Sequence, residues 1–357
     1  MTLHFLIDCD PGIDDALALT YAFAHPQVAV EGIVASGGNV STEQVGRNVR
    51  CLLELLGARG TPWALGAENP LAQPLTTTEE THGPLGTGHG KLPGQTTPTG
   101  RAHGEGADLW VETARRFPGK LHGLVLGPST NLALALRLDP DLPRYLASLT
   151  IMGGALNHRG NTMPTTEWNV HSDPEALHEL LETYSHEGSG VQGNQGQNGL
   201  GSSALPYAPL LCPLDATEEA IMTPQLRSRL VAGGGDLLTF LDQALQFYME
   251  FHEWDKLGFI AHVHDPYVTA LAVNRALAAS GQPHLTLGES TPVALGVELT
   301  GTLTRGQVVA DWLGRWEREP NAQALISARA PEFFEHLIQT VRAAYAPEDP
   351  PKPSSKK

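Results

Sequence analysis

Four aspartates lie within eight residues near the start of the chain, in the segment Asp8-Cys9-Asp10-Pro11-Gly12-Ile13-Asp14-Asp15. Carboxylates held this close repel one another unless a cation neutralises them, so the cluster predicts a metal site. Ligands that are all oxygen favour calcium or magnesium over zinc. The alternative is an acidic turn that caps a helix. The apolar strand before Asp8 and the tight Pro11-Gly12 turn favour the metal site.

Polar residues follow other predicted strands in the same way. Taken singly each is weak evidence, because an Asn at a strand end is ordinarily a turn or cap residue and a lone His is ordinarily structural. Together they indicate one ligand site, since ligands of open α/β sheets bind at the carboxyl ends of the strands. The segments are Gly37-Gly38-Asn39-Val40, Leu126 to Asn131, Met152-Gly153-Gly154 followed by Asn161 and Glu167-Trp168-Asn169, and His264-Asp265-Pro266.

The elements that must position these residues alternate between strands and helices. Apolar runs predict strands at Leu3–Ile7, Val28–Val34, Pro62–Leu65, Leu121–Leu126, Leu149–Met152 and Leu210–Leu214. Helical spacing of apolar residues predicts helices over Asp14–Phe23, Thr42–Leu56, Ala107–Phe117 and Asn131–Leu138. This alternation predicts an α/β fold with a mostly parallel, Rossmann-like central sheet flanked by helices and an active site at the carboxyl ends of the strands.

Two segments interrupt the alternation. Residues 76–106 form a long loop rich in Gly, Pro, Thr and His, which is typical of a lid or binding loop. Residues 185–203 are polar and low in complexity, so we expect a flexible insertion there. We therefore expect a single large domain over residues 1–345 and a disordered tail over 346–357.

Composition narrows the function classes. The chain holds 23 Lys and Arg against 39 Asp and Glu, a net charge of −16 that argues against binding to nucleic acid. Hydrophobic residues make up 41% of the chain, enough for a sizeable core. No apolar run approaches the ~20 residues of a membrane span. With no signal-peptide pattern and only Cys9, Cys51 and Cys212, we expect a cytoplasmic protein with reduced thiols.

The segment DCDPGIDDALAL resembles the N-terminal signature of the nucleoside hydrolases that cleave inosine, uridine and related ribonucleosides, normally DTDPGxDDA, with Cys9 in place of Thr. The segments LGPSTNLALAL, IMGGA, GNTMPTTEWNVHSDPEA and HDP follow in the family's order. THGPLG and TRGQVVADW agree more loosely. The resemblance covers residues 3–345 apart from the 185–203 insertion.

This resemblance implies a Ca²⁺ site made by the carboxylates of Asp10, Asp15 and Asp265 and the backbone carbonyl of Leu126, with ribose hydroxyls and a water completing the shell. The residues implied to hold the ribose hydroxyls are Asp14, Asn39, Asn161, Glu167 and Asn169. Trp168 stacks on the base or fills the pocket wall. The implied substrate is a small ribonucleoside of purine or pyrimidine salvage, and the implied assembly is a homodimer or homotetramer.

The resemblance also implies the reaction. A metal-bound water attacks C1′ through an oxocarbenium-like transition state and releases free base and ribose. Asp10 accepts the proton of that water, and attack opposite the base predicts inversion. His264 is the first candidate for protonating the leaving base and His82 is the second.

Two other functions fit parts of the sequence. A strand ending in Asp-x-Asp is also typical of haloacid-dehalogenase-type phosphatases, but those continue with Gly-Thr, and the nearest late Gly-Asp pair here is Gly235-Asp236. A calcium-dependent nucleoside- or ribose-binding protein without activity is the non-enzymatic alternative. The presence of both Asp10 and His264 favours the enzyme.

Overall fold

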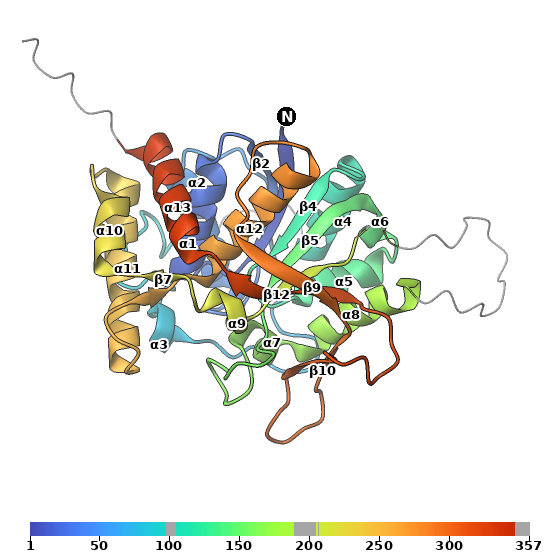
Figure 1. Ribbon diagram of the computed structural model, residues 1–357. Helices are drawn as coiled ribbons and strands as arrows, with labels where there is room; N and C mark the ends of the chain where they lie inside the picture. The colour runs from blue at the N-terminus through green and yellow to red at the C-terminus, as the bar shows by residue number, and fades with distance from the viewer. Residues whose placement is uncertain (98–104, 189–204, 206, 347–357) are drawn as a thin grey trace, which may run out of the picture.

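The computed structural model describes residues 1–97, 105–188, 205 and 207–346 (Figure 1). Eight strands form one sheet in the order β3-β2-β1-β4-β5-β6-β12-β9, in which only the β12–β9 pair is antiparallel. The strands are β1 (Leu3–Cys9), β2 (Val28–Ala35), β3 (Trp63–Leu65), β4 (Leu121–Val125), β5 (Leu146–Met152), β6 (Leu210–Cys212), β9 (Gly288–Val293) and β12 (Ala322–Ala328). The predicted α/β fold with a mostly parallel, Rossmann-like sheet is confirmed.

The strand order reverses between β1 and β4. From β1 the sheet continues through β2 and β3 toward one edge, and from β4 it continues through β5 and β6 toward the other. A crevice opens at such a switch point, outside the carboxyl ends of the two strands. Asp10 follows β1 and Leu126 follows β4, so the sheet topology brings the first motif and the Leu126 loop to the same crevice.

Helices cover both faces of the sheet (Figure 1). On one face α1 (Ile13–Ala24), α2 (Thr42–Leu55) and α12 (His264–Ala279) pack on the sheet, and α11 (Asp236–Trp254) and α13 (Ala330–Tyr345) pack on α1. The other packs against α4 (Gly106–Arg116), α5 (Thr130–Leu138), α6 (Leu142–Tyr145) and α8 (Pro174–Gly188). The apolar faces of these helices and the buried strands form two cores, one on each side of the sheet.

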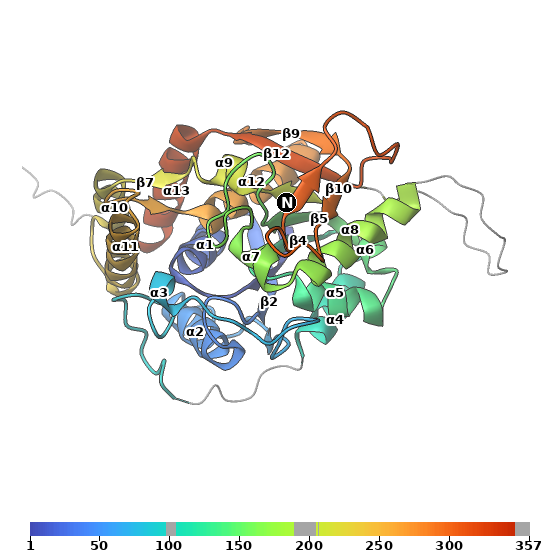
Figure 2. The ribbon, with the colours of Figure 1, turned by 90° about the horizontal axis from the view of Figure 1, so that it is seen from below.

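Short elements surround the carboxyl edge of the sheet, as Figure 2 shows from below. They are α3 (Glu79–His82), α7 (Trp168–Ser172), α9 (Leu214–Thr217) and two small antiparallel sheets, β7 (Ile221–Met222) with β8 (Ala261–His262) and β10 (Leu295–Val297) with β11 (Val308–Ala310). The helix α10 (Pro224–Val231) lies on the flank of the molecule beside α11 and α13 (Figure 1). Among the described residues, no helix is both long and apolar enough to cross a membrane.

The structure corrects three predicted boundaries. The long loop contains the helical turn α3, and residues 185–188 continue α8 instead of starting the insertion, whose remainder, 189–203, lies outside the described residues. The strand predicted over Leu210–Leu214 ends at Cys212, because Pro213 has no N–H for the sheet and instead caps α9. The three cysteines are buried and free, in agreement with reduced thiols.

Candidate active site

Four buried carboxylates meet at the switch point. Asp10 follows β1, Asp14 and Asp15 lie in the first turn of α1, and Asp265 lies in the first turn of α12. Single carboxylate oxygens of Asp14, Asp15 and Asp265 lie within 4.8 Å of one another. The N-terminal cluster is thus completed by Asp265, which lies 250 residues beyond Asp15 in the sequence.

Electrostatics in this cluster favour a cation. Burial, followed by the charge of Asp15, raises the pKa of Asp14 to about 8. Burial and neighbouring carboxylates also raise the pKa values of Asp10 and Asp265 well above the usual range. Buried carboxylates that are this close cannot all be ionised unless a positive charge neutralises them. Such a group of oxygens is typical of a divalent cation site. The donors fit an oxygen-seeking ion such as calcium.

Asn39 holds two of these carboxylates in place. Its backbone N–H donates to Oδ2 of Asp10 at 2.8 Å, and its side-chain amide donates to Oδ2 of Asp15 at 3.3 Å. Asp15 also accepts from the backbone N–H groups of Asp10 and Gly12 at 3.2 and 3.0 Å. The tight turn predicted at Pro11-Gly12 therefore folds back onto the carboxylate that follows it.

Asp8 is separate from the cluster although it is close in sequence. Its carboxylate accepts from Ser36, from the indole N–H of Trp110 at 2.8 Å and from Asn131 at 3.5 Å. Burial raises its pKa to about 6. Asp8 is a buried polar link between the sheet and α4, and the metal-type cluster contains Asp265 in its place.

The loop after β5 supplies the facing side of the crevice. The Glu167 carboxylate caps α7 and accepts from the backbone N–H groups of Gly154, Asn169 and Val170 at 2.9, 2.8 and 3.1 Å. The Asn169 amide donates to the carbonyl of Leu126 at 2.6 Å. The carbonyl that the resemblance assigned to the metal is therefore held in place by a residue assigned to the ribose.

These groups line a cavity of about 320 Å³. Every residue predicted for the site lines the cavity except Asp15, whose carboxylate bonds the backbone N–H groups of Asp10 and Gly12 and the amide of Asn39. The predicted residues in the wall are Asp10, Asp14, Asn39, His82, Leu126, Asn161, Glu167, Trp168, Asn169, His264 and Asp265. Asn161 is exposed at the rim, where its side chain accepts from the backbone N–H of Trp168 at 3.0 Å.

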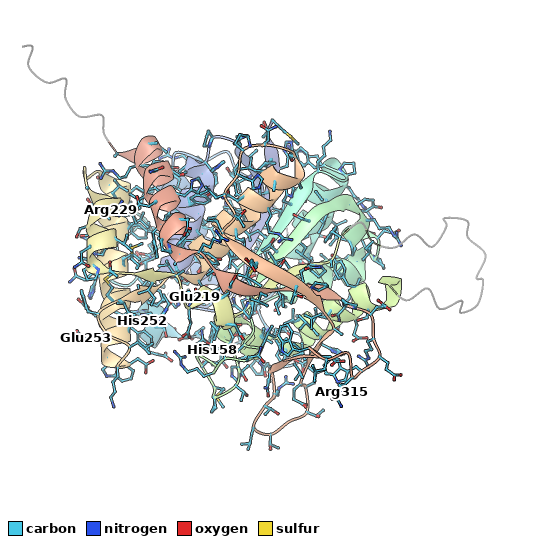
Figure 3. All side chains as sticks on the ribbon, viewed as in Figure 1. His158, Glu219, Arg229, His252, Glu253 and Arg315 are labelled. Carbon is cyan, nitrogen blue, oxygen red and sulfur yellow. The ribbon has the colours of Figure 1, made fainter. Side chains whose placement is uncertain are left out.

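A row of five rings forms one wall of the cavity, and we call it the histidine wall: His82, Tyr248, His252, His262 and His264. Successive ring centroids are 5.4, 4.5, 5.1 and 6.0 Å apart in that order. His82 comes from α3, Tyr248 and His252 from α11, and the last two from β8 and the start of α12. Figure 3 labels His252 on α11 and His158 on the loop after β5; His252 lines the cavity, as does Arg159, the residue after His158.

Sequence reasoning missed the middle of this wall. Tyr248 and His252 lie one helical turn apart on α11, which carries no recognisable motif. His262 and His264 alternate along an extended segment, so their rings lie on the same side. The His-x-His-Asp spacing was the available signal. Asp236, the acidic residue that a phosphatase would need late in the chain, begins α11 and does not line the cavity.

Comparisons with known proteins identify the family to which the sequence is similar. The family model described as "Inosine-uridine preferring nucleoside hydrolase" matches residues 5–335. The chain is 31% identical over 347 residues to a protein named pyrimidine-specific ribonucleoside hydrolase RihA from Citrobacter koseri, covering 97% of this chain and 100% of that one. It is 30% identical over 343 residues to the protein of the same name from Escherichia coli K12, covering 96% and 99%.

Solved structures show the same fold. A plant nucleoside hydrolase, the PpNRh1 enzyme, superposes with a TM-score of 0.79 at 24% identity, covering 96% of this chain and 100% of that one. A purine-preferring ribonucleoside hydrolase from Gardnerella vaginalis superposes with a TM-score of 0.80 at 23% identity, covering 96% and 98%.

Proposed function

The chain belongs to the inosine-uridine preferring nucleoside hydrolase family, and we propose that it is a calcium-dependent enzyme that releases free base and ribose from ribonucleosides. It is an N-ribohydrolase, as its family is. The observation that carries the calcium proposal is the buried cluster of Asp14, Asp15 and Asp265 next to Asp10. Relatives at 30 to 31% identity are named pyrimidine-specific, which favours uridine and cytidine as the first substrates to test.

The proposed ion is held by Asp10, Asp15, Asp265 and the carbonyl of Leu126. Two observations support this assignment. Burial and the neighbouring carboxylates raise the pKa values of Asp10 and Asp265, and all the proposed ligand atoms are oxygens, which calcium prefers. When bound, calcium supplies a positive charge that orients a water and lowers its pKa. An oxygen of Asp14 also lies within 4.8 Å of oxygens of Asp15 and Asp265, so Asp14 is a candidate further ligand of the ion besides its proposed role with the ribose.

The chain's own residues orient the sugar. Five side chains line the cavity and offer acceptors to the ribose hydroxyls: Asp14, Asn39, Asn161, Glu167 and Asn169. The amide N–H groups of Asn39 and Asn169 already donate within the protein, so these two amides offer their oxygens. Oε1 of Glu167 accepts only from the backbone N–H of Asn169 and keeps an acceptor site for a ribose hydroxyl, whereas Oε2 accepts from both Gly154 and Val170. Negative charge around the sugar stabilises the cationic ribosyl group that forms as the bond to the base breaks.

Asp10 is the proposed general base. Its carboxylate is held on one oxygen by the backbone N–H of Asn39, which leaves the other available to take a proton from the attacking water. Attack on the face opposite the base gives inversion at C1′. On the leaving side, His264 and His82 lie in the histidine wall and are the proposed donors to the base.

A substrate panel tests the activity. Release of base and ribose from uridine, cytidine, inosine, adenosine and guanosine is measured with and without a chelator that removes calcium. We expect hydrolysis that the chelator abolishes and calcium restores. If folded, calcium-replete protein hydrolyses none of the five, the substrate assignment is wrong. The homodimer or homotetramer and the cytoplasmic location stay predictions, of which light scattering tests the first.

A further inference from the structure

Two members of the histidine wall have their tautomers fixed by carbonyl groups. Nδ1 of His252 lies 2.8 Å from the backbone oxygen of Tyr248, and Nδ1 of His262 lies 2.8 Å from the backbone oxygen of Glu218. A carbonyl oxygen only accepts, so each Nδ1 must carry the hydrogen. In the neutral ring the second nitrogen, Nε2, is then a hydrogen-bond acceptor.

Both rings are neutral at neutral pH. Each is at least nine-tenths buried, and burial lowers the pKa of both imidazoles. His252 and the Arg159 guanidinium lower the pKa of His262 further, against the opposing effect of Glu218. Asp255 opposes the shift at His252 without reversing it.

Each Nε2 is available to a ligand. Within the part of the chain that the structure describes, no residue donates a hydrogen bond to either Nε2, and both rings line the cavity. The two ring centroids are 5.1 Å apart. Both ends of the histidine wall adjoin the carboxylate cluster, because His264 precedes Asp265 and His82 bonds the backbone N–H of Ile13, so His262 and His252 form the middle of the wall. A ribose held at the carboxylates with its base against this wall would bring the edge of the base to these two rings.

We propose, building on the nucleoside hydrolase function proposed above, that His252 and His262 form a pair of acceptors that selects bases carrying an N–H on their outer edge. The N3–H of uracil is such a group, and the N1–H of hypoxanthine is its purine counterpart. A base without that hydrogen leaves a buried acceptor without a partner, which a site built for a hydrogen bond penalises strongly. Neither residue takes part in breaking the glycosidic bond.

Methylated nucleosides test the proposal. The ratio kcat/KM is measured on the calcium-loaded enzyme for uridine, 3-methyluridine, which lacks the N–H, and 5-methyluridine, which has the same added volume but keeps the N–H. We expect 3-methyluridine to be about 10- to 100-fold poorer than both others. If 3-methyluridine is hydrolysed as well as uridine, or if 5-methyluridine is equally poor, the proposal is wrong. If no nucleoside is hydrolysed at all, the proposed function is wrong instead. If the enzyme prefers purines, the same comparison is made between inosine and 1-methylinosine, which lacks the N1–H.

Substitutions assign the effect to the two rings. Asn places an amide N–H where Nδ1 lies and has no atom at Nε2, so His252→Asn and His262→Asn keep the bond to the carbonyl and remove the acceptor. We expect each to lower kcat/KM for uridine more than for 3-methyluridine, so that the discrimination falls. Gln places its amide near Nε2, and His252→Gln should restore part of the discrimination.

A matched control exists on the surface. Nδ1 of His284 also bonds a backbone carbonyl, that of Gln282 at 2.9 Å, but its ring lies outside the cavity. His284→Asn should therefore keep the wild-type discrimination. Circular dichroism melting shows that each variant is folded. Discrimination that is unchanged in both His252→Asn and His262→Asn would overturn the proposal.

Discussion

Nδ1 of His82 accepts a hydrogen bond from the backbone N–H of Ile13 at 3.1 Å. This bond joins α3 to the first turn of α1 and leaves the hydrogen of the neutral ring on Nε2. Burial, followed by the charge of His252, lowers the pKa of His82 to about 3. His82 is therefore a neutral hydrogen-bond donor at physiological pH, with the opposite tautomer to His252 and His262.

That tautomer makes a prediction about the leaving group. His82→Ala should lower kcat/KM for uridine about 10- to 100-fold, because a donor to the departing base is lost. It should change the rate far less with 4-nitrophenyl riboside, whose leaving group departs without help from a donor. Steady-state rates on both substrates check this, and an equal loss on both would show that His82 only supports the structure.

Asp10→Asn tests the general base. The amide keeps the shape of the side chain but neither accepts a proton from water nor carries charge to an ion, so turnover should fall by several orders of magnitude. Asp242, which is partly exposed and pairs with Arg227, provides the control variant Asp242→Asn, for which we expect the wild-type rate. A rate for Asp10→Asn equal to that of the control would exclude the assigned role.

Gly38 supports Asp10 through the absence of a side chain. A Cβ on Gly38 would lie 2.1 Å from Oδ2 of Asp10, so Gly38→Ala must displace this carboxylate from Asn39. We expect calcium affinity and turnover to fall together, by about 10-fold or more, since small displacements of a catalytic group are costly. At Gly60, a Cβ has nothing within 4 Å, so Gly60→Ala should leave both quantities unchanged. A normal Gly38→Ala enzyme would contradict the geometry.

The metal-free protein should lose stability as pH rises. Asp14 has a folded pKa of about 8 against an ordinary value of 3.8, so the folded state binds more protons than the unfolded state between these values. Its contribution to the free energy of unfolding therefore falls as pH rises toward about 8 and is constant above it. Buried histidines with lowered pKa values, such as His82, reduce the free energy of unfolding only below about pH 6.5, where the unfolded state binds protons that the folded state does not. Their effect therefore lies outside this pH window.

Urea unfolding at pH 6.5, 7.5 and 8.5 measures this effect. With chelator present we expect the free energy of unfolding to decrease across the series. Saturating calcium should reduce the slope, because the ion replaces the protons. A flat profile without calcium would show that the carboxylates are not as strongly coupled as the geometry indicates.

The sequence was sufficient for the fold because its signals are local. The apolar runs of β1, β2, β4 and β5 and the amphipathic helices between them each follow from their own residues. The boundaries that failed depend on neighbours, as at Pro213, where a capping role shortens β6.

The site was predicted only where motifs mark it. Asp10, Asp14 and Asp15 come from one signature, and Asp265 from a His-Asp-Pro segment. Tyr248 on α11 has no such mark, because its position at the cavity depends on how α11 packs beside α3 and β8. Asp8 is the opposite case, because it belongs to the signature but lies outside the carboxylate cluster. Its side chain bonds Ser36, Trp110 and Asn131, and the signature alone does not indicate these partners.

Calcium binding measured together with turnover tests the central claim most directly. Protein stripped of metal is titrated with calcium while bound ion and the rate of uridine hydrolysis are recorded at each step, for the wild type and for Asp265→Asn. We predict a rate that rises in proportion to the bound calcium and a variant in which both curves shift to higher calcium together. Full activity in protein shown to be free of metal would contradict the account.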